Sequence, residues 1–117
     1  MELKEVMAQH SFAVLGDTIN EEKYAYQIKQ GLLKKGYTVH CVGSELASLN
    51  DIEGDIDIVD LCIHPAKGLL LLRECKKPFQ CIVIQPGASD EALLTYLREQ
   101  HLPYLEGCLL VGLRLYT

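Results

Sequence analysis

The sequence has neither a long apolar segment nor an excess of positive charge. Its longest apolar runs, such as Gly68–Leu72, are far shorter than the roughly 20 residues that a membrane-spanning helix requires. The opening segment Met1–Glu5 carries too much charge for a secretion signal. Eleven Lys and Arg residues against sixteen Asp and Glu residues give a net charge of -5, whereas a nucleic-acid binder needs a basic face. We therefore expect a cytoplasmic protein that binds neither membranes nor nucleic acids.

Paired cysteine and histidine motifs are also missing. The five cysteines are an odd number without a C-x-x-C pair, whereas small secreted domains usually carry an even disulfide framework. The four histidines are scattered, with no pair at the spacing of metal ligands. We therefore expect reduced cysteines and no metal. Cys41, Cys62 and Cys81 lie inside apolar runs, which favours a role as small buried hydrophobic residues.

Sequence motifs of catalysis are absent as well. There is no nucleophile elbow, no P-loop and no G-x-G-x-x-G dinucleotide fingerprint. The clustered carboxylates Asp51, Glu53, Asp55 and Asp57 are typical of a solvated linker rather than of an acid and a base held in a cleft. These absences favour a binding protein over an enzyme.

Hydrophobic residues at 49% and charged residues at 23% are ordinary values for a globular protein, and the length suits one domain spanning residues 1–117. Apolar and β-branched runs predict strands at residues 11–15, 37–42, 56–63, 79–84 and 104–106. Helical periodicity predicts helices at residues 21–35, 65–74 and 89–100. Residues 2–9 suit a short helix or an irregular lead-in, residues 45–55 a linker with one helical turn, and residues 109–116 an apolar tail that packs on the core.

Local signals define two of these helices. Pro65 suits the first turn of its helix, and Ser89 is the expected N-cap of the following one. In the first long helix, the residues on the apolar face are Tyr24, Ile28 and Leu32.

Strands that alternate with helices imply parallel crossovers and a sheet covered on both faces. We therefore predict an α/β protein, a three-layer Rossmann-like sandwich with a mainly parallel five-stranded sheet. Ligands of such sheets bind outside the carboxyl ends of the strands. This rule points to four loops, at residues 16–23, 41–45, 62–67 and 84–89.

The first of these loops has the groups that a phosphate site needs. Gly16 allows the backbone to approach a ligand, Thr18 offers a hydroxyl and Lys23 a cation. Each of them also has a structural interpretation, namely a strand-to-helix turn, a helix cap and a solvated lysine.

Motifs along nearly the whole chain follow the order G-x-S, R-P-S-Y, G-Y, P-V-N-P, V-D-I-V-D, R-R-P, Q-x-G and D-R-C. The matching positions are Gly16, Thr18, Lys23, Tyr26, Gly36, Tyr37, Val42, Ile56–Asp60, Pro65, Gln85, Gly87 and Cys108. In this order of motifs the chain resembles the small bacterial and archaeal CoA-binding proteins, relatives of the nucleotide-binding domain of the succinyl-CoA synthetase alpha subunit.

The resemblance implies non-catalytic binding of coenzyme A or an acyl-CoA at the carboxyl edge of the sheet, by a carrier, sensor or regulatory module. It implies that the pyrophosphate lies at the Gly16 loop and the adenine at the end of the second strand. The candidate binding residues are Gly16, Asp17, Thr18, Lys23, Tyr26, Val42, Gly43, His64, Pro65, Lys67, Gln85 and Gly87.

Several positions depart from the family pattern. P-V-N-P is replaced by Cys41–Ser44, the two arginines by Ile63 and His64, and the arginine before the late cysteine by Gly107. Asp17 adds a carboxylate beside the expected phosphate loop, where like charges repel.

These departures keep an alternative open, an interaction protein or homodimer that has lost nucleotide binding. The apolar segment Leu109–Leu113 would supply its contact surface. A further alternative is a subunit that works with a separate catalytic partner. In either interpretation Cys108 lacks a neighbouring base or C-x-x-C partner that would activate it toward a CoA thiol.

Overall fold

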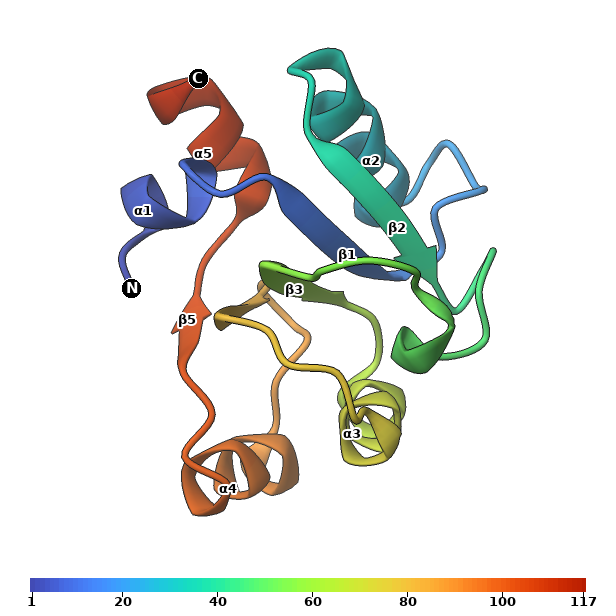
Figure 1. The fold of residues 1–117 in the computed structure, drawn as a ribbon, viewed down its shortest axis with the longest axis vertical. Coiled ribbons are helices and arrows are strands. Elements are labelled where there is room, and N and C mark those ends of the chain that lie inside the picture. Colours follow the sequence, from blue (N-terminus) through green and yellow to red (C-terminus); the bar gives the residue numbers. More distant parts are fainter.

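Five parallel strands form the central layer of the computed structural model, which describes all 117 residues (Figure 1). The strands are β1 (Ser11–Gly16), β2 (Thr38–Val42), β3 (Ile58–Cys62), β4 (Cys81–Ile84) and β5 (Tyr104–Glu106). Their order is β2-β1-β3-β4-β5, and every neighbouring pair is parallel. The Rossmann-like α/β prediction is confirmed, with a sheet that is entirely parallel. The winding reverses between β1 and β3, which makes the crevice at their carboxyl ends the expected ligand position.

Helices cover both faces of the sheet. The helices α1 (Leu3–Met7), α2 (Tyr24–Lys34) and α5 (Leu109–Tyr116) lie on one face, and α3 (Pro65–Glu74) and α4 (Glu91–Glu99) lie on the other (Figure 1). Alternation along β1 divides the core accordingly, because Phe12 and Val14 pack toward α2 whereas Ala13 and Leu15 pack toward α3 and α4. None of these helices has the length and apolar character needed to cross a bilayer.

Helix α2 begins at Tyr24, three residues later than the periodicity predicts. Side chains of the preceding loop compete with the helix for backbone N–H groups. Asp17 Oδ1 accepts hydrogen bonds from the N–H groups of Ile19 and Asn20, and Asn20 Oδ1 accepts one from the N–H of Glu22. Tyr24, expected on the apolar face, is 68% exposed. The core-facing residue of the first turn is Ala25 instead.

The N-cap of α4 is Asp90 rather than Ser89, so that prediction is wrong by one residue. Asp90 Oδ1 accepts the backbone N–H of Leu93 at 2.9 Å. The hydroxyl of Ser89 is instead directed to Glu106 Oε1, at 3.4 Å. Ser89 and Asp90 are both residue types that cap helices. Asp90 is the N-cap because its backbone has the extended conformation that this position requires.

The linker after β2 contains the expected helical turn, η1 (Leu49–Asp51), but it also contributes to the core. Its side chains Leu49, Ile52 and Ile56 are buried in the core. Asp57 is not a solvated linker carboxylate, because its Oδ2 accepts the backbone N–H groups of His10 and Ser11 at 3.0 and 2.9 Å. Asp57 therefore fixes the start of β1 beside the start of β3.

Candidate functional site

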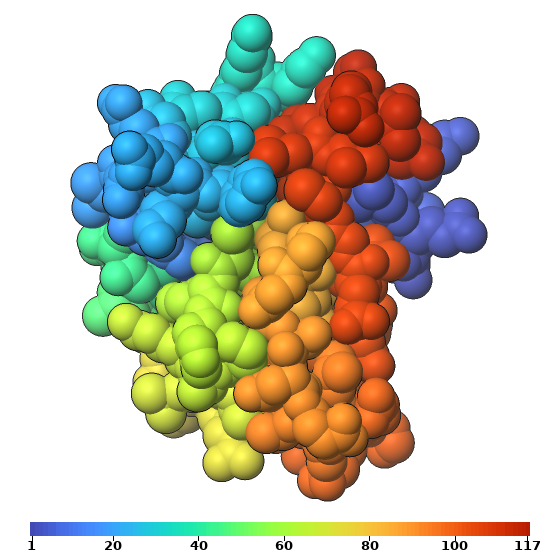
Figure 2. Space-filling model, turned by 180° about the vertical axis from the view of Figure 1, so that it is seen from behind, coloured from blue at the N-terminus to red at the C-terminus, as the bar shows by residue number.

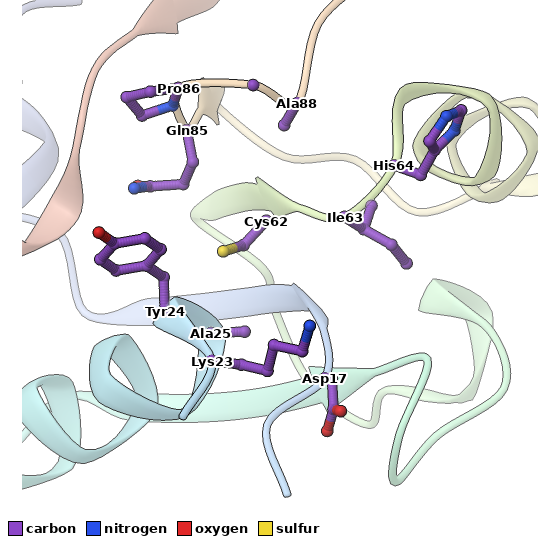
Figure 3. Close-up of a pocket in the computed structure, with 11 residues that line it drawn as sticks. Asp17, Lys23, Tyr24, Ala25, Cys62, Ile63, His64, Gln85, Pro86 and Ala88 are labelled. Carbon is purple, nitrogen blue, oxygen red and sulfur yellow. The ribbon is translucent and has the colours of Figure 1, made fainter. Parts of the chain in front are cut away.

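Two adjoining clefts lie at the carboxyl ends of the strands. The first encloses about 380 Å³ between the start of α2 and the loops after β3 and β4, and the second encloses about 320 Å³ between the ends of β1, β2 and β3. The first cleft is lined by Asp17, Lys23, Tyr24, Ala25, Cys62, Ile63, His64, Gln85, Pro86, Gly87 and Ala88 (Figure 3). The second cleft is lined by Gly16, Asp17, Gly43, Ser44, Ile63 and Lys67. Figure 2 shows the face on which the start of α2, the loop after β3 and the loop after β4 meet.

Gly16 ends β1 and lines the second cleft. A Cβ atom on this residue would lie 2.4 Å from the carbonyl oxygen of Cys62 and 3.0 Å from the Cβ of Ala25. Because the Cys62 carbonyl belongs to the neighbouring strand and cannot move away without disturbing the sheet, only glycine permits the close approach of β1 to β3 here.

The N-terminus of α2 has free hydrogen-bond donors. The backbone N–H groups of Tyr24, Ala25 and Tyr26 have no acceptor within the protein, and the N-cap residue Lys23 makes no side-chain cap. Two of these residues, Tyr24 and Ala25, line the first cleft. Unpaired N–H groups and the positive end of the helix dipole attract an anion, so this is the position in the cleft best suited to a phosphate.

Asp17 turns its carboxylate toward its own loop rather than toward Cys62 across the first cleft (Figure 3). Its Oδ1 accepts the N–H groups of Ile19 at 3.0 Å and Asn20 at 3.1 Å. These backbone hydrogen bonds, that of Asn20 above all, lower the pKa of the Asp17 carboxyl, and the charge of Lys23 adds to the effect. Asp17 is therefore ionised at neutral pH.

Thr18 connects the first loop to the second. Its side chain is only 1% exposed, and its Oγ1 lies 2.6 Å from Ser44 Oγ. The hydroxyl of Thr18 is therefore paired within the protein. Val42 is buried as well, and the second cleft is reached instead by Gly43 and Ser44.

His64 caps helix α3 at the mouth of the first cleft. Its Nδ1 accepts the backbone N–H of Ala66 at 3.2 Å, which leaves Nε2 as the donor of the neutral ring. Pro65 is buried at the first helical position, where its missing N–H costs nothing. Lys67, in the first turn of α3, lines the second cleft.

Gln85 fixes the loop after β4. The side chain is 5% exposed, and its Oε1 accepts the backbone N–H of Leu109 at 2.9 Å. Because Oε1 is held by α5, the Nε2 amide is the part of Gln85 that can serve a ligand in the first cleft. Gly87, at φ +87°, takes the left-handed turn that returns the chain toward α4.

Cys62 departs from the expected buried position. It is half-buried at the end of β3 and lines the first cleft, whereas Cys41 and Cys81 are buried as predicted. Burial above all raises the pKa of the Cys62 thiol to about 12. At neutral pH Cys62 is a protonated thiol, which is a weak nucleophile. No three His, Cys, Asp or Glu side chains converge to form a metal site.

The sequence profile of a protein family described as a CoA binding domain matches residues 10–114. The chain belongs to this CoA-binding domain family. A search of curated proteins found no significant match.

Solved structures share the fold of this CoA-binding domain. A conserved hypothetical protein from Pyrococcus furiosus is 25% identical, with a TM-score of 0.77 over 88% of this chain and 98% of its own. The PH1109 protein redesigned for binding is 21% identical, with a TM-score of 0.82 over 97% and 89% of the two chains. A protein from Thermus thermophilus is 22% identical, with a TM-score of 0.77 over 100% of both chains.

Most of the candidate residues of the CoA-binding domain lie in the clefts. The candidates that line a cleft are Gly16, Asp17, Lys23, Gly43, His64, Lys67, Gln85 and Gly87. Those that line neither cleft are Thr18, Tyr26, Val42 and Pro65. Sequence reasoning missed the lining residues Tyr24, Ala25, Ser44, Cys62, Ile63, Pro86 and Ala88. Each of them is within three positions of a candidate, so proximity to the strand ends was the available signal, but which side chains face the cleft depends on the tertiary structure.

Proposed function

We propose that this protein binds coenzyme A or an acyl-CoA without catalysing a reaction, as a carrier, sensor or regulatory module. The observation that carries the proposal is that two clefts lie side by side at the sheet edge and share the lining residues Asp17 and Ile63, so that an elongated ligand can occupy both. Membership of the CoA-binding domain family supports coenzyme A as that ligand.

The chemistry of the path suits the three parts of coenzyme A. In our proposal the adenine end occupies the second cleft beside Gly43 and Lys67. The pyrophosphate accepts hydrogen bonds from the free N–H groups at the start of α2. The pantetheine arm, which carries amide groups and ends in a thiol, extends through the first cleft, where Gln85 Nε2 donates to an amide carbonyl.

The first cleft suits passive binding. Its neutral walls include Ala25, Ile63 and Ala88, and the Cys62 thiol is protonated at neutral pH. A neutral thiol neither attacks a thioester rapidly nor repels one, so an acyl-CoA would remain intact in the cleft.

Isothermal titration calorimetry with CoA, acetyl-CoA, NAD and ATP tests the proposal. We expect CoA and acetyl-CoA to bind, and a hundredfold excess over the dissociation constant to stabilise the fold by about 2.7 kcal/mol in thermal shift. Lys67→Gln should weaken CoA binding, whereas Lys35→Gln, an equal charge change at the far end of α2, should not. Absence of CoA binding at millimolar concentration would refute the proposal and favour the alternative of an interaction protein.

A further inference from the structure

We propose that Asp17 is a specificity-determining residue, which reduces the affinity that the site gains from the phosphate groups of its ligand. The inference rests on the proposed function, because it concerns ligands that join phosphate to a pantetheine arm. Its consequence is that recognition depends on the neutral pantetheine arm in the first cleft more than on phosphate charge.

The position of Asp17 is the first observation. Only Asp17 and Ile63 line both clefts. A ligand that extends from one cleft into the other must pass these two residues, and in CoA the connecting group is the pyrophosphate. The fixed carboxylate of Asp17 therefore acts on the most highly charged part of the bound molecule.

The second observation is that Asp17 occupies the anion-binding groups of its own loop. Successive N–H groups of a loop that follows a strand are a common phosphate cradle. Here the N–H groups of Ile19 and Asn20 both donate to Asp17 Oδ1, and the N–H of Glu22 donates to Asn20 Oδ1. The Asp17 carboxylate thus occupies the loop N–H groups that a phosphate would otherwise bind. The N–H groups of α2 are the backbone donors that remain available to a ligand phosphate.

The third observation is the small number of cations that could offset this charge. Lys23 is the lysine of the first cleft and Lys67 that of the second, and the other residue of the junction, Ile63, is apolar. Lys23 is close enough to Asp17 to lower the pKa of its carboxyl, so part of the positive charge of Lys23 is already balanced. Little net positive charge remains at the junction for a pyrophosphate.

Substitution of the carboxylate tests the inference. Asp17→Asn keeps the Oδ1 acceptor for Ile19 and Asn20, so the loop retains its conformation while the charge is removed. Glu22→Gln is the matched control, because it removes an equal charge from the same loop outside both clefts. Calorimetry measures CoA and pantetheine, which has no phosphate, at low and high ionic strength.

We expect Asp17→Asn to tighten CoA binding about fivefold at low salt, and less at high salt, because charges a few ångströms apart in water interact by about 1 kcal/mol. Pantetheine binding should not change, and Glu22→Gln should have a smaller effect on CoA. If the wild type binds CoA but the two variants change its affinity equally, or if pantetheine gains as much as CoA, the role of Asp17 is refuted while the proposed function stands. If neither the wild type nor either variant binds CoA, the role of Asp17 and the proposed function are both refuted.

Discussion

At the scale of single residues, Asp60 is the most unusual side chain of the core. It lies in the middle of β3, between the register partners Val14 and Val83, and is 0% exposed. Neither carboxyl oxygen has a hydrogen-bond partner. Burial without a partner disfavours the charged form and raises the pKa of Asp60 well above its ordinary value. Burial therefore favours the neutral, protonated form of Asp60 in the folded protein, and holding this polar group without a partner lowers the free energy of unfolding.

This burial predicts a pH-dependent stability. Unfolded Asp60 loses its proton near pH 3.9, whereas folded Asp60 keeps it, so the unfolded state binds fewer protons and the free energy of unfolding falls as the pH rises from about 4 toward the raised pKa. Asp60→Asn removes this titration. Urea midpoints at a series of pH values should diverge, in favour of the variant, as the pH rises.

Asp55→Asn, at an exposed position, is the control for the loss of one negative charge. Its urea midpoints should follow those of the wild type across the pH series. Parallel curves for Asp60→Asn and the wild type would mean that Asp60 is ionised in the folded state.

Gly16 provides a second prediction at this scale. In Gly16→Ala the new methyl group meets the Cys62 carbonyl oxygen at 2.4 Å, so we expect a loss of more than about 2 kcal/mol in the free energy of unfolding, together with weaker CoA binding. Gly36→Ala is the control, because its φ of +88° is strained but no atom lies within 4 Å of the new methyl group. That variant should lose only about 1 kcal/mol. Equal losses in urea denaturation would argue against the close approach of β1 and β3.

At the scale of elements, the helices differ in how their first backbone N–H groups are satisfied. Helix α2 begins without a side-chain cap and keeps its N–H groups for a ligand, whereas α3 and α4 are capped by His64 and Asp90. Helix α2 starts at the reversal of the winding, between β1 and β3. The unpaired donors of α2 therefore lie where a phosphate is expected.

The cap of α4 is testable with two adjacent variants. Asp90→Ala removes the acceptor of the Leu93 N–H and should lower the free energy of unfolding by about 1 kcal/mol. Ser89→Ala should cost only a few tenths of a kcal/mol, since an exposed hydroxyl contact with Glu106 is lost. Urea denaturation distinguishes them, and the reverse ranking would restore Ser89 as the cap.

At the scale of the whole molecule, the reversal of the winding places both clefts at one edge of the sheet. CoA should therefore slow amide hydrogen exchange at one end of the protein. We expect the largest change at Tyr24, Ala25 and Tyr26, whose N–H groups have no partner in the free protein. Mass spectrometry of exchange should detect it in peptides spanning residues 17–26 and 62–68.

Peptides from α4, which lines neither cleft, are the internal control for this measurement. Their exchange should change little. Equal protection of α4 and of the start of α2 would indicate general stabilisation of the fold and would contradict binding along the clefts.

Much of the fold was predictable from the sequence because it depends on local patterns. Alternating apolar runs and helical periodicity are repeated over many residues, so an error at one position does not change the element. The five strands, the helices α2, α3 and α4 and the four loops at the carboxyl edge follow from these patterns, whereas α5 was predicted only as an apolar tail. Element boundaries were less accurate where side chains compete with the helix for backbone N–H groups, as Asp17 and Asn20 do before α2.

By itself, the sequence determined the α/β class, the position of the ligand loops and the family resemblance, since each rests on residues near one another in the chain or in a fixed order. Only the tertiary structure decided that Thr18 is paired with Ser44, that Tyr24 and Cys62 face a cleft, and that the two clefts share Asp17. These features depend on the packing of strand ends that are distant in the chain. The direction of one side chain there is set by neighbours that no local pattern identifies.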